Sequence, residues 1–417
     1  MELGIIGLVG ACAYALDCIE AELVHVTNRH GKRVAYISVC MAEKMGINGK
    51  ALQDLAVCAL LHDNALTQYI YEEVQESGVI LDENESEYSS VVRKTAAEIA
   101  DKKIGLHCVY GEQNIKKLPF ATDVSGAILY HHENADGTGV FGKKWDEIPL
   151  FARIIHLCDV VDIIGNSCNF SDKSWITATE YVRRNRNTVF DSDCADAFLE
   201  VISGNDFAGM SQETFEKELW NKIPREKRQC DFETCKNIAD FFALIVDYKS
   251  EFTGRHSLGV AQKAAAVAEY LGYPEADIEK IYVAGALHDI GKMAIGNEIL
   301  EKPGRLTDEE FSRMKNHAGY TYMILSEVEG FDEVRDWAAF HHEKLDGTGY
   351  PFGKKADELT EPERIMACVD IYQALTEARP YKSGMSHDKA CGVLEDMAEK
   401  GWIDAGLVKK IRKCFAD

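Results

Sequence analysis

The chain has 417 residues, with 46 Lys or Arg against 69 Asp or Glu, so its formal net charge is −23 with histidine neutral. This balance excludes a general binder of nucleic-acid polymers, because such proteins present net basic surface to the phosphate backbone. At roughly 100 to 200 residues per domain, the length predicts two or three domains. With only 8 prolines and 46% hydrophobic residues, the composition excludes a disordered or fibrous protein.

The N-terminal run over residues 3–16 is apolar and lacks a preceding basic segment. It is shorter than the roughly 20 residues that a membrane-spanning helix needs, so we expect a buried helix and no membrane span. The 13 cysteines include no Cys-x-x-Cys pair, and the chain shows no secretory leader. This usage indicates a reduced, cytoplasmic protein with free thiols.

The histidines reveal an internal duplication. In each copy a histidine is followed 32 residues later by a His-Asp pair, and a later histidine is followed after 24 residues by a His-His pair that leads into Asp-Gly-Thr-Gly. The first copy contains His30, His62, Asp63, His107, His131, His132 and Asp159. The second copy contains His256, His288, Asp289, His317, His341, His342 and Asp370. Five matched histidine positions at constant spacing identify a tandem repeat.

The elements between these residues read as helices. Apolar residues recur at helical spacing over 260–271 and 278–285, and Gly272 stands where a helix C-cap is expected. Thr307 and Glu310 form a capping box that opens the helix carrying His317. No alternating pattern bounded by hairpin turns stands out, so we predict an all-α fold of two tandem helical domains. We place the first domain at 1–203, a polar linker at 204–231 and the second domain at 232–417.

Five histidines and two aspartates per copy are nitrogen and oxygen ligands suited to first-row divalent metals. Seven ligands are too many for one ordinary ion. Two ions about 3.5 to 4 Å apart clamp the attacking and leaving oxygens of a phosphoryl centre, so the set predicts hydrolysis of a phosphate ester. The alternative is that the metals only hold helices together.

At this point the second copy resembles an HD-GYP domain, a branch of the HD phosphohydrolase superfamily. The resemblance rests on the ligand order, on Lys292 in His-Asp-Ile-Gly-Lys, and on Gly349, Tyr350 and Pro351 in Asp-Gly-Thr-Gly-Tyr-Pro. It covers about 232–410, and a looser likeness covers 12–203. It implies an all-helical domain with two or three metals, commonly iron or manganese. The implied substrate is a cyclic dinucleotide, chiefly cyclic di-GMP, cut to the linear dinucleotide and sometimes to GMP.

The resemblance also implies residue roles. Asp289 would bridge two metals. His256, His288 and Asp370 would complete the ligands of one ion, and His317, His341 and His342 would complete those of the other. Lys292 would lie beside the scissile phosphate. Substrate contacts fall to Gly349, Tyr350 and Pro351 and, further along, to Arg379 and Lys382. The family's third-metal glutamate is replaced by Phe252, so we expect two metals and leave three open. Gln373 stands where the family usually has an aspartate.

The two copies differ around the shared ligands. Copy one has Leu66 in place of Lys292, and Val140-Phe141 in place of Tyr350-Pro351, and nothing that matches Arg379 and Lys382. It also carries a longer, acidic stretch after Asp63, which would repel an anionic substrate. We therefore predict a metal-loaded first domain that is catalytically weak or regulatory, and a catalytic second domain. An HD-type phosphohydrolase acting on another nucleotide, and a non-enzymatic signalling or scaffold protein, remain as alternatives. A homodimer also stays open.

Overall fold

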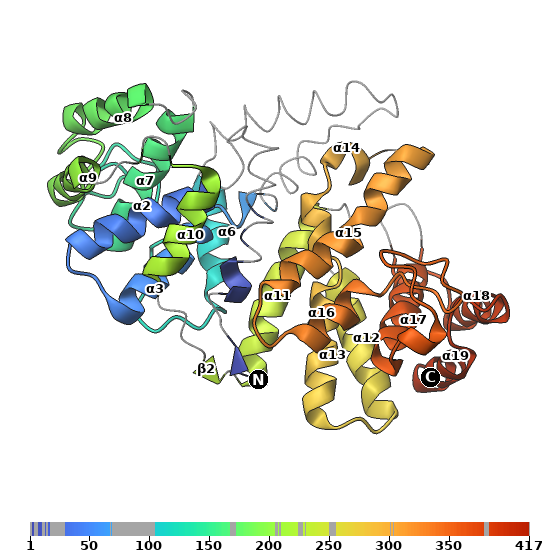
Figure 1. The fold of residues 1–417 in the computed structure, drawn as a ribbon. Helices are drawn as coiled ribbons and strands as arrows, with labels where there is room; N and C mark the ends of the chain where they lie inside the picture. The colour runs from blue at the N-terminus through green and yellow to red at the C-terminus, as the bar shows by residue number, and fades with distance from the viewer. Residues whose placement is uncertain are drawn as a thin grey trace. The chain divides into compact units, whose positions relative to one another are not determined.

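The computed structural model describes most of the chain. The residues described are 2–3, 7–10, 13, 16, 30–66, 68, 105–166, 172–204, 207, 210–223, 228–229, 231–249, 256–300, 302, 304–378 and 383–416. Within them nearly all of the regular secondary structure is helical, which confirms the predicted all-α class (Figure 1). One short antiparallel pair joins β1 (Glu2–Leu3) to β2 (Arg228–Gln229). None of these helices combines the length and apolar character needed to cross a bilayer.

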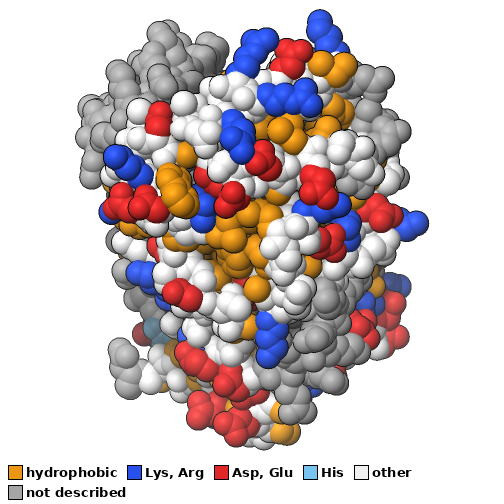
Figure 2. Space-filling model, turned by 90° about the vertical axis from the view of Figure 1, so that its left-hand side faces the viewer, with side chains coloured by type: hydrophobic (Ala, Val, Ile, Leu, Met, Phe, Trp, Pro, Cys, Tyr) orange, Lys and Arg blue, Asp and Glu red, His pale blue; other side chains and the backbone are white. Residues whose placement is uncertain are grey.

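The chain divides into two compact units. One consists of Gly4–Lys227, and the other of residues 1–3 with Arg228–Asp417. Of the N-terminal apolar run, the described residues Leu8, Val9, Ala13 and Leu16 are buried, as predicted. Figure 2 shows one face of the molecule, on which acidic and basic side chains surround an area of hydrophobic ones.

The first unit is built around one buried helix. Its helices are α2 (His30–Lys44), α3 (Gly49–Leu60), α6 (Gly105–Ile115), α7 (Leu150–Asn166), α8 (Asp172–Arg184), α9 (Ser192–Gly204) and α10 (Gln212–Lys222). Helix α2 packs against α3, α7, α9 and α10 and is buried from His30 to Ala42. Its position explains why His30 at its start, a predicted ligand, is buried.

The stretch expected to be a linker contributes to the first unit instead. Helix α10 lies within 204–231, and its Phe215 and Leu219 are buried. The Phe215 ring meets Tyr36 of α2 edge-on, with 5.5 Å between ring centroids. The two apolar residues stand four positions apart and share one helix face, so this polar segment has an amphipathic core-facing helix. The first unit therefore extends beyond residue 203.

The second unit repeats the helical layout. It contains α11 (Phe232–Lys249), α12 (His256–Tyr270), α13 (Glu275–Leu287), η1 (Ile290–Ala294), α14 (Asn297–Leu300), α15 (Asp308–Ser326), α16 (Asp332–Ala339), η2 (Ala356–Glu358), α17 (Glu361–Thr376), α18 (His387–Glu399) and α19 (Ala405–Cys414). The predicted capping box is present, with Thr307 and Glu310 each bonding the other's backbone N–H. Gly272 follows α12 with φ +78°, as a C-cap glycine requires.

Several predicted ligand residues stand at or near the ends of helices. His30 and His256 open α2 and α12, His288 directly follows α13, and His62 stands two residues after the end of α3. Neighbouring positions inside a helix point about 100° apart, whereas a chain leaving a helix can turn both members of a pair to one side. The helix ends thus allow each His-Asp pair to face a single centre.

The close packing of α12 and α13 predicts a stability effect. A Cβ on Gly285 would lie 2.6 Å from the Ala261 Cα of the neighbouring helix. Gly285→Ala should therefore lower the free energy of unfolding by about 1 to 3 kcal/mol, measured by urea denaturation. The matched control is Gly392→Ala in α18, where a Cβ meets no heavy atom within 4 Å. That change should be neutral or stabilising by up to about 1 kcal/mol. Equal effects of the two changes would contradict this packing.

Candidate metal centres

In each unit the structure brings the seven predicted ligand residues into one buried cluster. In the second unit, Asp289 Oδ1 lies 3.5 Å from His317 Nε2 and 3.8 Å from His341 Nε2. Its other oxygen lies 3.2 Å from His288 Nε2. On the far side, His256 Nε2 is 3.2 Å from Asp370 Oδ1. The Asp289 carboxylate thus stands between two groups of histidines, where a carboxylate shared by two ions would have to be.

The first unit repeats this arrangement. Asp63 Oδ1 lies 3.4 Å from His107 Nε2 and 3.5 Å from His131 Nε2. His30 Nε2 is 3.2 Å from Asp159 Oδ1, as its counterpart is from Asp370 in the second unit. The duplication therefore extends from the sequence to the geometry of the cluster.

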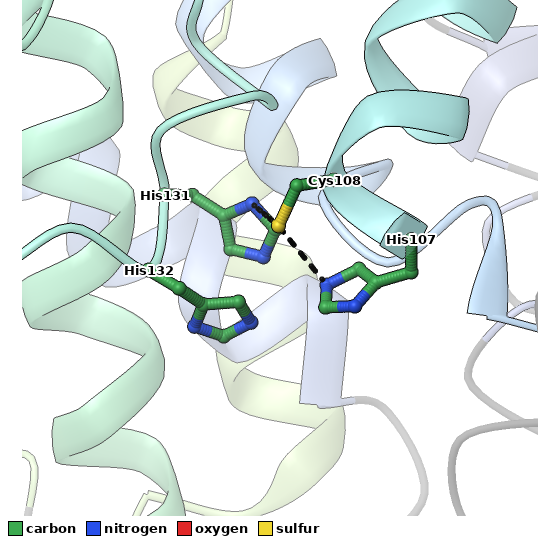
Figure 3. A group of neighbouring side chains, drawn as sticks. All are labelled: His107, Cys108, His131 and His132. Atoms are coloured by element: carbon green, nitrogen blue, oxygen red, sulfur yellow. Dashed lines mark hydrogen bonds between the residues drawn. The ribbon is translucent and has the colours of Figure 1, made fainter. Parts of the chain in front are cut away.

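The ligand atoms fall into groups of the size that one ion needs. Within each group all ligand atoms lie within 4.8 Å of one another. The second unit has His256/His288/Asp370, His288/Asp289/His341 and His317/His341/His342. The first unit has His30/His62/Asp63 and His107/Cys108/His131/His132, the latter shown in Figure 3. Each cluster thus offers more than one adjoining position for a divalent ion.

Backbone hydrogen bonds fix which ring nitrogen faces the centre. In five histidines Nδ1 lies 2.6 to 2.9 Å from the carbonyl oxygen three residues earlier; these are His62, His131, His288, His317 and His341. A carbonyl only accepts, so Nδ1 must carry the proton and donate. In the neutral ring the Nε2 lone pair is then directed to the cluster, the tautomer that a metal ligand requires.

Several atoms facing the centre have no hydrogen-bond partner. In the described chain these buried atoms include His62 Nε2, Asp63 Oδ1 and His131 Nε2, and in the second unit His288 Nε2 and Asp289 Oδ1. Each buried polar group without a partner costs about 1 to 3 kcal/mol. A divalent ion would satisfy these lone pairs together, and nitrogen with carboxylate oxygen is a donor set suited to manganese, iron or zinc. The residues therefore fit a metal centre.

Electrostatics keeps the carboxylates of the second unit ionised. Burial alone would raise the pKa of Asp289, but His288 and Lys292 hold it well below the usual range. Burial likewise opposes ionisation of Asp370, and the hydrogen bond with His256 together with His288 lowers the pKa of that carboxyl. Both groups are thus charged and ready to coordinate a cation at neutral pH.

Lys292 reaches the centre of the second unit. Its Nζ lies 2.5 Å from Asp289 Oδ2, so a fixed positive charge stands beside the predicted bridging carboxylate. In the first unit the corresponding Leu66 is buried and brings no charge. The two centres therefore differ in local charge, as the sequence indicated.

The Asp-Gly-Thr-Gly loop has the same anchor in both units. The Glu343 carboxylate accepts hydrogen bonds from the backbone N–H groups of Phe352, Gly353 and Lys354. A Cβ on Gly349 would lie 2.4 Å from the Lys344 nitrogen, so close backbone packing by itself requires glycine there. In the first unit Glu133 and Gly139 have the corresponding contacts.

Beyond Gly349 the loop of the second unit reaches the cluster. The Tyr350 ring lies 4.7 Å from that of His342, between centroids, and Pro351 follows through a cis peptide bond. Tyr350 therefore borders the centre, whereas Gly349 shapes the loop. The predicted phosphate contacts Arg379 and Lys382, the third-metal position at Phe252 and the acidic stretch after residue 68 lie outside the described residues.

Sequence reasoning missed the carboxylate that orients His256. In the first unit Asp162 Oδ2 accepts from His30 Nδ1 at 2.7 Å, and its carboxylate also binds Arg33. Gln373 replaces this aspartate in the second unit, but Glu377 Oε2 lies 2.9 Å from His256 Nδ1. The second unit thus supplies the carboxylate from a residue four positions, or about one helical turn, after the replaced aspartate, since positions four apart share a helix face.

Two neighbouring differences accompany this replacement. Gln373 Oε1 accepts from Lys263 Nζ at 2.5 Å, and its Nε2 donates to Glu377 at 3.4 Å. Gly259 leaves room for the amide, because a Cβ there would lie 2.3 Å from Gln373 Nε2. The first unit has Arg33 at the position of Gly259. The sequence signal that could have indicated the contact with His256 is the glutamate four residues after Gln373.

Comparisons with known proteins agree with this geometry. The HD domain family model matches residues 15–194 and 241–407. A 3'3'-cGAMP-specific phosphodiesterase 1 of Vibrio cholerae is 27% identical over 94% of this chain and 88% of its own length. A cyclic di-GMP phosphodiesterase of Pseudomonas aeruginosa is 39% identical over 36% of each chain.

One solved structure matches over nearly the whole length. It is a cyclic GMP-AMP specific phosphodiesterase of V. cholerae, with a TM-score of 0.66 and 25% identity. The match covers 99% of this chain and 97% of that one. The likeness therefore includes both units and not the second alone.

The contact between Glu377 and His256 predicts an effect on metal affinity. Glu377→Gln removes the charge that orients the ring and raises its basicity, so affinity of the second unit for Mn²⁺ should fall about 10- to 100-fold, measured by calorimetric titration. Glu395→Gln is the control, since Glu395 pairs with Arg412 on α18 and α19. An unchanged affinity in Glu377→Gln would show that the carboxylate does not act on the ligand.

Proposed function

The chain belongs to the HD domain family, and from this premise we propose that it is a metal-dependent phosphodiesterase that hydrolyses a cyclic dinucleotide. Two independent facts support the proposal. The relatives that match it are named as cyclic-dinucleotide phosphodiesterases. The buried clusters combine ionised carboxylates with histidines whose Nε2 atoms lack protein partners, as a metal-dependent hydrolase requires.

For the substrate we propose 3'3'-cGAMP in place of the cyclic di-GMP expected from the sequence. The observation that carries this choice is the extent of the matches. The cGAMP-specific relative shares 94% of this chain, and the solved cyclic GMP-AMP specific phosphodiesterase shares 99%. The Pseudomonas cyclic di-GMP phosphodiesterase shares only 36%, about one domain. Cyclic di-GMP is the second candidate.

The residues of the second unit provide the parts of an in-line hydrolysis. Two divalent ions, iron or manganese, would activate a water and polarise the phosphodiester oxygens when bound, and a third ion stays open. His256, His288 and Asp370 would hold one ion and His317, His341 and His342 the other, with Asp289 shared. Lys292, beside Asp289, would stabilise the negative charge that develops on the phosphoryl oxygens.

The remaining parts would position the substrate. Tyr350 borders His342 and offers an aromatic ring beside the ions, where it would contact a ribose or base of the cyclic dinucleotide. Arg379 and Lys382 would hold and position the substrate phosphate, as cations bind a phosphate oxygen. Glu377 would keep His256 in the ligand tautomer.

We assign catalysis to the second unit and a weak or regulatory role to the first. The first unit retains all seven ligands but has Leu66 where the second has Lys292, and Val140 and Phe141 where the second has Tyr350 and Pro351. A panel of cyclic dinucleotides and other nucleotides tests the proposed hydrolysis against the two alternatives, an enzyme acting on another nucleotide and a non-enzymatic binding protein. Release of the linear dinucleotide from 3'3'-cGAMP faster than from cyclic di-GMP supports the proposal, and no release from either overturns it.

Paired ligand changes test the division of labour. Replacing His288 and Asp289 with alanine should abolish hydrolysis of 3'3'-cGAMP, because it removes the shared carboxylate and a ligand of the second unit. The matched replacement of His62 and Asp63 should leave much of the activity. Product release is followed by liquid chromatography at equal protein concentration. The reverse pattern would place catalysis in the first unit.

Lys292 has a separate test. Lys292→Met keeps the length of the side chain without its charge, so kcat should fall about 10²-fold or more while the Mn²⁺ affinity does not decrease. Lys280→Met is the control, since Lys280 pairs with Asp277 and Glu333 away from the centre. An unchanged kcat, or a loss of activity that excess metal restores, would remove Lys292 from the reaction.

A further inference from the structure

One ligand-type residue distinguishes the two clusters. Cys108 follows His107 on α6 and is fully buried. The corresponding residue after His317 in the second unit is Ala318, which is also fully buried. The duplication thus has a thiol at one centre and a methyl group at the same position of the other.

The thiol lies among the histidine ligands. Cys108 Sγ is 3.5 Å from His107 Nε2 and 3.8 Å from His131 Nδ1. Figure 3 shows the sulfur between the rings of these two residues, with His132 nearby. The ligand atoms of all four residues lie within 4.8 Å of one another, and the buried His131 Nε2 has no hydrogen-bond partner.

The separation between Cys108 Sγ and His107 Nε2 matches that around a tetrahedral ion, whereas His131 Nδ1 donates to the Ile128 carbonyl and only its Nε2 is directed to the cluster. With a metal–sulfur bond of about 2.3 Å and a metal–nitrogen bond of about 2.0 to 2.1 Å, a tetrahedral angle puts sulfur and nitrogen about 3.6 Å apart. The Sγ–Nε2 distance of 3.5 Å is close to that value.

We propose that Cys108 joins His107, His131 and His132 in binding a divalent ion beside the Asp63 carboxylate, giving the first unit a thiolate-containing position selective for zinc. This rests on the proposed metal centre of that unit. On binding, the S–H bond breaks, a sulfur–metal bond forms and the proton passes to solvent. Thiolate favours zinc over manganese, whereas the second unit offers only nitrogen and oxygen.

The proposal gives the asymmetry of the two units a chemical cause. Structural zinc sites have all four positions filled by protein, whereas catalytic sites keep one position for water or substrate. Asp63, three histidines and Cys108 would give the ion of the first unit five protein ligands. With Ala318 in the second unit, the corresponding ion has only Asp289 and three histidines, so a fifth position is left for water or substrate.

Cobalt(II) spectroscopy of the full chain tests this. Alanines at His288 and Asp289 weaken the second centre, and Co²⁺ is added to saturation. Visible ligand-field bands report bound cobalt, and a near-ultraviolet sulfur-to-cobalt charge-transfer band reports thiolate ligation. Both should be present, and Cys108→Ala should lose the charge-transfer band, keep the visible bands and bind Zn²⁺ at least about 10-fold more weakly. Cys58→Ala, a buried cysteine of α3 outside the ligand groups described, should keep both bands.

The outcomes distinguish failure of the Cys108 assignment from failure of the proposed metal centre of the first unit. Visible bands without a charge-transfer band, or a charge-transfer band that survives Cys108→Ala, would overturn the assignment of Cys108 and leave the metal centre standing. No visible bands at all would overturn both. If the changes at His288 and Asp289 prevent folding, the difference spectrum of wild type minus Cys108→Ala in the intact chain decides the same question. Ala318→Cys in that Cys108→Ala chain should restore a charge-transfer band.

Discussion

The structure depends on burying carboxylates among histidines in the middle of a helical bundle. Each unit encloses two aspartates and five histidines, and several of their atoms face one another without hydrogen bonds. Taking a charge out of water costs several kcal/mol even after relaxation, so such a cluster is stable only if it receives compensating positive charge. Bound divalent ions would supply this positive charge.

The same constraint determines how far the sequence predicted the site. The histidines and aspartates recur at matched spacings in the two copies, so comparison of the copies predicted the seven residues that the structure brings together in each unit, together with the all-α fold. The whole-chain charge of −23 said little about the centres, where Lys292 supplies local positive charge beside Asp289. The net negative charge excludes general binding of nucleic-acid polymers, but it is compatible with a small phosphate substrate.

What the sequence did not reveal depends on contacts made in three dimensions. Glu377 replaces the carboxylate of Asp162 from one turn further along, which is visible only when His256 is placed beside it. The segment containing Phe215 has a polar composition, and only its packing on Tyr36 shows that it belongs to the first unit. Cys108 looked like one of many buried thiols until the histidines around it were in place.

The two units therefore share a set of predicted ligands and differ in what surrounds it. The central claim is that hydrolysis depends on metal held by the second cluster. The most direct measurement is turnover of 3'3'-cGAMP by the full chain before chelation, after chelation and after addition of Mn²⁺ or Fe²⁺, with metal content measured in parallel. The account predicts that the chelated chain is inactive and that added metal restores release of the linear dinucleotide. Undiminished turnover by the metal-free chain would contradict it.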